Sequence, residues 1–211
     1  MDKLRLRFKK TGRAVYISHL DLMQTMQRAF SRAGYELKYS EGFNPHPQIS
    51  IALPLSVGTA SLCELMDFKL RDEAELSPLP ARLSAALPEG LEVTDCYEPT
   101  RKAALLKYLR VSGLFEYDVR DVEEMAQALR SFYSAGEIVI AKKTKRGMGE
   151  TDIKASIREI SFEVKDRAVE LEAVISAQEP TLNPELLWGC PETAGPGHCT
   201  GFCKVHTAGD L

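Results

Sequence analysis

The chain has 211 residues, of which 44% are hydrophobic and 27% charged, and 27 Lys and Arg against 30 Asp and Glu give a net charge of −3. This composition fits a soluble globular protein that is long enough to bury a core without disulfide or metal staples. The chain has no apolar run of the ~18 residues that a membrane span needs. Residues 1–5 alternate in charge and therefore do not resemble a signal peptide. The odd number of cysteines, five, argues against a disulfide framework. We therefore expect a cytoplasmic protein with no membrane contact.

The first half of the chain predicts one compact βαββαβ unit over residues 1–98. Leu4, Leu6 and Phe8 alternate with cations, which indicates a strand with one apolar and one basic face. Ser18 is a candidate N-cap, with Asp21 in the capping-box position of a helix that ends near Gly34. Further strands are expected over residues 35–39, 48–53, 61–70 and 91–97, with a second helix over 78–87. This order is that of a ferredoxin-like unit.

The second half repeats the order more loosely. A strand over residues 107–119, a helix over 122–133 and a strand over 137–141 precede a charged loop at 142–152. A hairpin over 153–164 and 168–175 and a short helix near Asn183 follow. We therefore predict an α+β fold of tandem ferredoxin-like (βαββαβ) units with antiparallel sheets, the second over 103–187, followed by a divergent, flexible tail over 188–211. The charge distribution also indicates two similar halves, because residues 1–50 and 101–150 are basic while 51–100 and 151–211 are acidic.

Two motifs in the first fifty residues predict a binding or catalytic site. In residues 16–21, YISHLD, His19 would stand at a helix N-terminus, a position that favours anions, beside Tyr16 and Asp21. In residues 41–47, EGFNPHP, two prolines stiffen a loop that carries Glu41, Phe43, Asn44 and His46. The alternative interpretations are a surface capping box for the first motif and a turn whose aromatic ring covers the core for the second.

Basic residues predict contacts with a nucleic-acid backbone, because neutralising phosphates dominates such binding. The candidates lie on the first strand, on the polar face of the first helix and in the 142–152 loop: Arg5, Arg7, Lys9, Arg28, Arg32, Lys142, Lys143, Lys145 and Arg146. Tyr16 and Phe43 would stack on bases. A solvated hairpin loop is the alternative for the last four cations. An RNP-type aromatic signature, a P-loop and a dinucleotide fingerprint are all absent from the sequence.

Candidate metal ligands lie only near the end of the chain. A zinc site would use Cys190, Cys199, Cys203 and His206, but the close CxxC pair is missing, and we expect no metal site. The three-cysteine motif of a radical-type iron–sulfur cluster is also missing.

The chain resembles a bacterial family known as radical SAM-linked, or radical SAM-associated, proteins. The resemblance rests on residues 6–8 and 16–23, on the motifs EGFNPHP (41–47) and PLSVG (54–58), and on later segments at 142–152 and 179–180, and it covers residues 3 to 187. It implies a radical SAM protein as partner, which would itself hold S-adenosylmethionine and the iron–sulfur cluster, so that this chain would bind no cofactor. The tail after Leu187 departs from the family pattern.

Three functions follow as hypotheses. The first is an accessory, non-catalytic module that presents RNA to the radical SAM partner in RNA modification or translation-related work. The second is a metal-free RNA-processing enzyme with His19 or His46 as general acid or base, by a fold-level resemblance to the RNA-processing proteins of CRISPR systems. The third is a protein-binding adaptor without nucleic acid, in which the acidic segment 64–75 would meet a basic partner.

Overall fold

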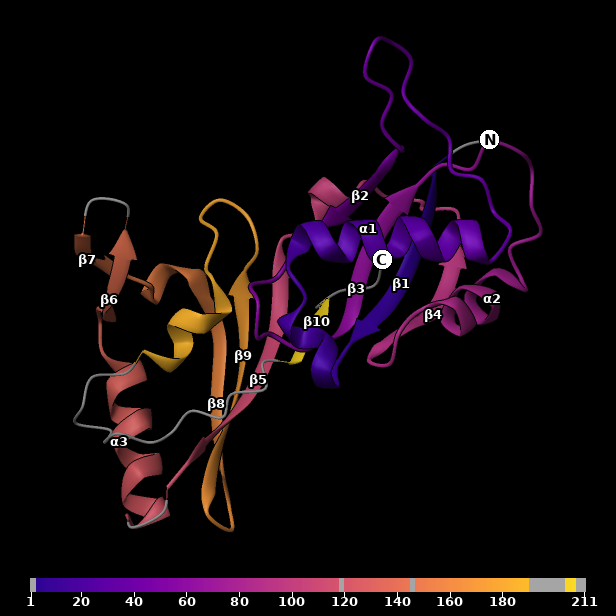
Figure 1. The fold of residues 1–211 in the computed structure, drawn as a ribbon. Coiled ribbons are helices and arrows are strands. Elements are labelled where there is room, and N and C mark those ends of the chain that lie inside the picture. The colour runs from indigo at the N-terminus through magenta and orange to yellow at the C-terminus, as the bar shows by residue number, and fades with distance from the viewer. Residues whose placement is uncertain (1–2, 118–119, 145–146, 190–203, 208–211) are drawn as a thin grey trace. The chain divides into compact units, whose positions relative to one another are not determined.

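The computed structural model describes residues 3–117, 120–144, 147–189 and 204–207 (Figure 1). The chain divides into two compact units that meet in sequence between Leu105 and Leu106. In the described residues, three α-helices and antiparallel sheets make up a mixed α/β protein. None of the described helices has the length and apolar character that crossing a membrane requires.

The first unit follows the predicted order of elements, apart from the strand expected over residues 35–39. It consists of β1 (Leu4–Lys10), the 3-10 helix η1 (Gly12–Tyr16), α1 (His19–Arg32), β2 (Ile49–Ala52), β3 (Ser61–Phe68), α2 (Leu79–Ala86), β4 (Leu91–Tyr97) and η2 (Ala103–Leu105). Its sheet runs in the order β4-β1-β3-β2, and every neighbouring pair is antiparallel. Leu4, Leu6 and Phe8 lie in the core together with Met26 and Phe30 of α1, so the predicted apolar face of β1 is confirmed.

The predicted start of α1 is also confirmed. Ser18 caps the helix, because its hydroxyl oxygen accepts a hydrogen bond from the backbone N–H of Asp21 at 3.2 Å. The same hydroxyl donates to the Asp21 carboxylate at 2.7 Å, which binds the two side chains of the box to each other. The helix ends at the cap residue Ala33, where Gly34 takes a positive φ of 81°.

The strand predicted over residues 35–39 does not form. The segment makes only two isolated bridges, Leu37 with Leu70 and Tyr39 with Pro47. The pairing ends beyond Tyr39 because the backbone N–H of His46 donates to the Ser40 hydroxyl at 3.1 Å. A side-chain acceptor thereby replaces the backbone carbonyl that a longer ladder would need.

The second unit contains one α-helix in its described residues. Its elements are β5 (Tyr108–Glu116), α3 (Val122–Ser134), β6 (Val139–Thr144), β7 (Gly147–Asp152), η3 (Lys154–Ser156), β8 (Ile157–Lys165), β9 (Ala168–Ser176), η4 (Pro184–Trp188) and β10 (Lys204–Thr207). One antiparallel sheet has the order β10-β5-β9-β8, and β6 and β7 form a separate hairpin. The tandem repeat of two ferredoxin-like units is therefore not confirmed.

The hairpin of β6 and β7 replaces the loop predicted over residues 142–152. Its two strands pair from Val139 and Asp152 to Thr144 and Gly147. The Asp152 carboxylate accepts hydrogen bonds from the backbone N–H groups of Ile138 and Lys154, each at 2.9 Å, which fixes the base of the hairpin. The prediction failed because this segment is charged and lacks the apolar alternation that identifies a half-buried strand.

The end of the second unit is held by packing. Trp188 in η4 lies edge-on to Phe115 of β5, with ring centroids 5.1 Å apart, and it covers Gly113, where a Cβ atom would clash with the indole. The Tyr133 hydroxyl donates a hydrogen bond to the Leu187 carbonyl. Within the stretch predicted as a flexible tail, the structure thus places Trp188 against β5 and pairs the backbone of residues 204–207 with the same strand.

Candidate anion-binding groove

The cations of β1 are paired with carboxylates of the neighbouring strands. Arg7 lies 3.4 Å from Asp95 and Lys9 lies 3.1 Å from Glu92, both at the surface. Arg5 is only 1% exposed, and its guanidinium donates two hydrogen bonds to the Asp67 carboxylate, from Nε at 2.6 Å and from Nη2 at 3.1 Å. The predicted basic face of β1 therefore contains one buried and two compensated charges.

The bond to Asp67 raises the pKa of Arg5 above its ordinary value, although burial opposes the shift. The guanidinium is thus charged at every relevant pH, and its charge is balanced inside the unit. It is not exposed to a phosphate.

The YISHLD motif places its polar residues at the exposed start of α1. Tyr16 is 73% exposed, and His19 is exposed in the first turn. Asp21 is bound to the capping hydroxyl of Ser18, so its structural role is satisfied. The PLSVG motif lies beside this region, because the backbone N–H of Gly58 donates to the carbonyl of Val15 at 2.8 Å.

The EGFNPHP motif forms a loop that projects between α1 and β2 (Figure 1). Phe43 lies midway between the bridged residues Tyr39 and Pro47 and is fully exposed, and Glu41, Asn44 and His46 are also exposed. His46 Nδ1 lies 2.9 Å from the Ser40 hydroxyl and 3.4 Å from the Asn44 carbonyl, which ties the two sides of the loop together. The predicted alternative, an aromatic ring that covers the core, is wrong.

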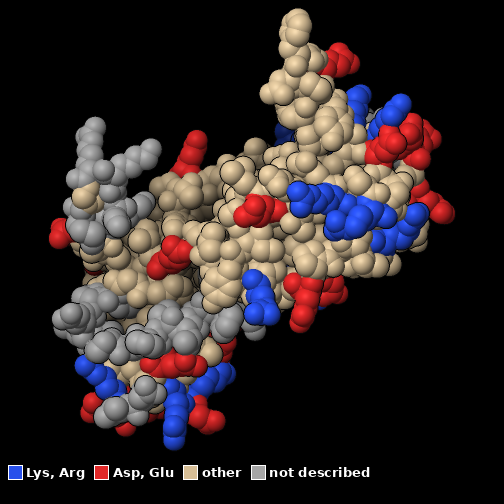
Figure 2. Space-filling model, viewed as in Figure 1, with Lys and Arg blue, Asp and Glu red and all other residues tan. Residues whose placement is uncertain are grey.

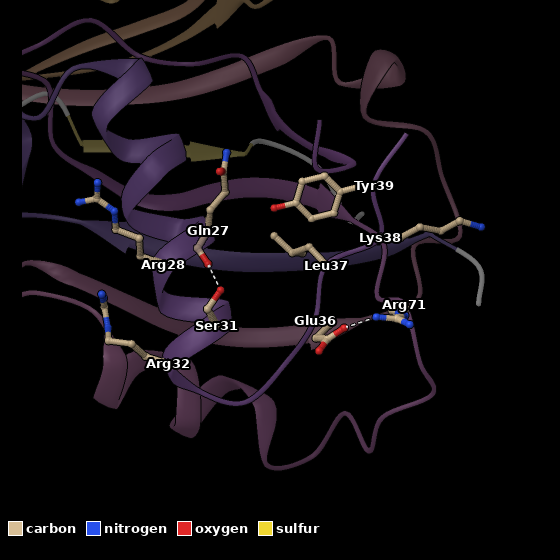
Figure 3. A pocket seen from close by; sticks show the side chains of 9 residues that line it. All are labelled: Gln27, Arg28, Ser31, Arg32, Glu36, Leu37, Lys38, Tyr39 and Arg71. Carbon is tan, nitrogen blue, oxygen red and sulfur yellow. Dashed lines mark hydrogen bonds and ion pairs between the residues drawn. The ribbon is translucent and has the colours of Figure 1, made fainter. Parts of the chain in front are cut away.

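The described part of the first unit also contains a groove of about 880 Å³ between α1 and the segment that leads into this loop (Figure 3). Helix α1 contributes successive turns of its polar face: Gln27, Arg28, Ser31 and Arg32. The opposite wall is formed by Glu36, Leu37, Lys38, Tyr39 and Arg71. Residues four apart lie one above the other on a helix, so each of the two α1 pairs follows the length of the groove.

The groove is cationic. Four cations and one acid line it, and that acid, Glu36, is bound to Arg71 at 2.8 Å. Arg32 donates one hydrogen bond to the Ala86 carbonyl at 2.6 Å, which positions the guanidinium and leaves its other N–H groups for a ligand. Figure 2 shows Lys and Arg side chains gathered over α1 on the face viewed. The lining therefore suits a phosphate-bearing ligand.

Of the predicted residues, the groove brings together only Arg28 and Arg32. Reasoning from sequence missed Gln27, Ser31, Lys38, Tyr39 and Arg71. Gln27 and Ser31 could have been identified, because they precede Arg28 and Arg32 by one residue each and share their four-residue spacing along α1. Arg71 carries no such signal, because only the pairing of residues 36–38 with 69–71 places it at this wall.

The remaining predicted cations and ligands belong to the second half of the chain. Lys142 and Lys143 lie on β6, where the structure describes the backbone, and Lys145 and Arg146 lie outside the described residues. Cys190, Cys199 and Cys203 also lie outside them, and His206 belongs to β10. Within the described residues, no three His, Cys, Asp or Glu side chains gather as metal ligands.

A buried ionisable pair lies beside the sheet core, away from the groove. Glu64 on β3 is 4% exposed and Lys10 on β1 is 2% exposed. Burial raises the pKa of Glu64 to about 7, against the opposing effects of a hydrogen bond from Ser61 and the charge of Lys10. Burial likewise lowers the pKa of Lys10.

The structure defines a mixed α/β protein with antiparallel sheets and a groove lined mainly by cations on its first unit. Residues 3–184 match a family described as an uncharacterized protein conserved in bacteria (DUF2344), and the chain belongs to this family. No curated protein matches the chain.

Proposed function

We propose that this protein is an RNA-binding accessory module and that the groove beside α1 is its phosphate-binding surface. The observation that carries the proposal is that Arg28, Arg32 and Lys38, with Arg71 paired to Glu36, all line one groove. Exposed Tyr39 inside the groove and Phe43 on the adjoining loop supply aromatic faces for stacking. A groove for a small inorganic anion would not need either ring.

The partner in this proposal is a radical SAM protein that acts on the bound RNA. The resemblance of the YISHLD and EGFNPHP motifs to radical SAM-linked proteins supports it. The partner would supply S-adenosylmethionine and the iron–sulfur cluster, and this chain would supply binding and orientation. The exposed loop of residues 41–47 is available for contact with RNA or with the partner.

We also propose that the second unit is a diverged copy of the first. The strand orders β4-β1-β3-β2 and β10-β5-β9-β8 support this proposal. In this correspondence η4 takes the place of α2, and the hairpin of β6 and β7 is an insertion after the first helix. The polar face of α1, with its two arginines, would then be a feature that the first copy developed for binding.

Crosslinking and sequencing of RNA bound to the protein in cells would identify the RNA, and a salt titration of binding would test the groove. We expect Arg28→Gln/Arg32→Gln to reduce the slope of log affinity against log salt by about 1.4, because each lost contact with a single strand removes about 0.7. Arg7→Gln/Lys9→Gln changes the net charge equally on already compensated cations and serves as the matched control. Equal effects of the two double variants would refute the groove, and an absence of any bound RNA would favour the adaptor hypothesis.

A further inference from the structure

The middle of the groove is uncharged, and its charged side chains lie at the two rims, one of which also carries Glu36, paired with Arg71 (Figure 3). Gln27 and Ser31 on α1 face Leu37 and Tyr39 on the opposite wall, and the Tyr39 hydroxyl points toward Gln27. Arg28 and Arg32 lie on the helix side, whereas Lys38 and Arg71 lie on the other. The arrangement separates a centre of aromatic, aliphatic and amide groups from flanking positive charges.

Tyr39 is held by its backbone and not by burial of its ring. The Gln48 side-chain amide donates to the Tyr39 carbonyl at 3.2 Å, and the bridge with Pro47 fixes the same residue. The side chain nevertheless remains 52% exposed. Because exposed aromatic surface is unfavourable in water, a ligand that covers this ring would gain from the hydrophobic effect.

We propose that the groove takes an unpaired nucleotide of single-stranded RNA, with the base in the uncharged centre and the flanking phosphates on the cationic rims. The base stacks on Tyr39 beside Leu37, and the Gln27 amide, which can both donate and accept, bonds to the edge of the base. This inference rests on the proposed RNA binding and names the form of RNA that the site selects.

Single-stranded RNA fits this lining better than a duplex does. In an A-form duplex the base faces are stacked on each other, and the deep major groove excludes side chains, so recognition falls on phosphates and 2′-hydroxyls. A ring placed inside a groove reaches a base only when that base is unstacked. A protein that read duplex RNA by its phosphates would use the rims alone.

The test measures binding of a fluorescein-labelled, 12-nucleotide mixed-sequence RNA to the full chain, as a single strand and annealed to its complement. Tyr39→Leu removes the ring and keeps an apolar side chain, and we expect it to weaken single-strand binding about tenfold. The salt slope should not change, because no phosphate contact is lost. Tyr39→Phe should keep most of the affinity, since the ring remains. Leu20→Ala removes another exposed apolar side chain of α1, one that does not line the groove, and should have no effect.

The outcomes separate this inference from the proposal on which it rests. Unchanged single-strand binding in Tyr39→Leu, together with a loss in Arg28→Gln/Arg32→Gln, would overturn base recognition and leave phosphate binding intact. Duplex binding as tight as single-strand binding would overturn the inference in the same way. Failure of the wild-type chain to bind either RNA would overturn both. Because Tyr39 is half exposed, its variants should melt at the wild-type temperature, which circular dichroism would check.

Discussion

Arg5 and Asp67 form an ion pair in the interior of the first unit. Breaking it should cost more free energy of folding than breaking the surface ion pairs of the same strand. The Arg5 side chain is 1% exposed and that of Asp67 is 9% exposed. The exposed ammonium of Lys3 also lies 3.4 Å from the Asp67 carboxylate. A buried pair costs more when it is broken than a surface pair, because the remaining charge keeps its desolvation penalty without a partner.

We therefore expect Asp67→Ala to lower the free energy of unfolding by about 3–5 kcal/mol, because it leaves the Arg5 charge buried and unpaired. Glu92→Ala breaks the exposed pair with Lys9 and should cost less than about 1 kcal/mol. Urea denaturation of the two variants and the wild type measures both values. Similar losses in the two variants would show that Arg5 is hydrated in solution.

The second prediction at this scale concerns Glu64 and pH. Its pKa is raised to about 7 in the folded protein, so between the ordinary pKa of glutamate and about pH 7 the folded state binds more protons than the unfolded state. The free energy of unfolding should therefore fall as pH rises through this window, with a contribution from Glu64 of roughly 3 kcal/mol. Glu64→Gln should remove that contribution and flatten the dependence.

The slope between pH 5 and pH 8, measured by denaturant unfolding, is the readout for Glu64. Above about pH 7 the absolute stability of Glu64→Gln should also change, because Lys10 there loses an ionised buried partner. Glu89→Gln, at an exposed position, is the matched control and should keep the wild-type slope. A wild-type slope in Glu64→Gln would mean that the carboxylate is ionised at low pH in the folded state.

At the scale of elements, periodicity in the sequence predicts most of the first unit. The alternation from Leu4 to Phe8 predicts β1, and the cap at Ser18 with the helical spacing after it predicts α1. Both signals are local in the sequence. The fate of Arg5 was not predictable in this way, because its partner Asp67 lies 62 residues away. Alternation alone assigns a charged residue to solvent, and only the register of β1 with β3 brings these two side chains together.

The same limit applies to the groove. One of its walls is the polar face of α1, which the sequence shows, and the other is an irregular segment that bridges residues distant in the chain. Similarly, the apolar run over residues 137–141 indicates only the start of β6, and the rest of the hairpin of β6 and β7 is defined by the pairing of its two strands. The sequence thus fails to indicate elements that form by pairing without a pattern of apolar residues.

A prediction at this scale concerns β10, which pairs with β5 from Lys204 and Ser112 to Thr207 and Leu109. A truncated chain that ends after Gly189 lacks β10, so the backbone groups of β5 that pair with β10 should lose their hydrogen-bond partners. We expect faster hydrogen exchange of residues 109–112, measured by mass spectrometry, and stronger aggregation. A chain that ends after Thr207 retains the strand and should exchange like the full chain. Identical protection in the three proteins would show that β10 does not protect β5.

At the scale of the whole molecule, the core and the groove of the first unit are both built from residues before Leu105. The core runs from Leu4 to Val93, with Cys96 packed against it, and the groove runs from Gln27 to Arg71. A chain of about 100 residues with one continuous core is large enough to fold alone. The first unit should therefore fold, and keep its groove, in the absence of the second unit.

We expect a fragment of residues 1–105 to fold cooperatively, with dispersed amide signals in its NMR spectrum and a single unfolding transition. It should also bind single-stranded RNA with the salt slope of the full chain, because all four cations of the groove are retained. A fragment that binds the dye ANS and lacks dispersed signals would show that the first unit needs the second for packing. A folded fragment with a smaller salt slope would instead assign further phosphate contacts to the second unit, where Lys142 and Lys143 on β6 would be the first cations to substitute.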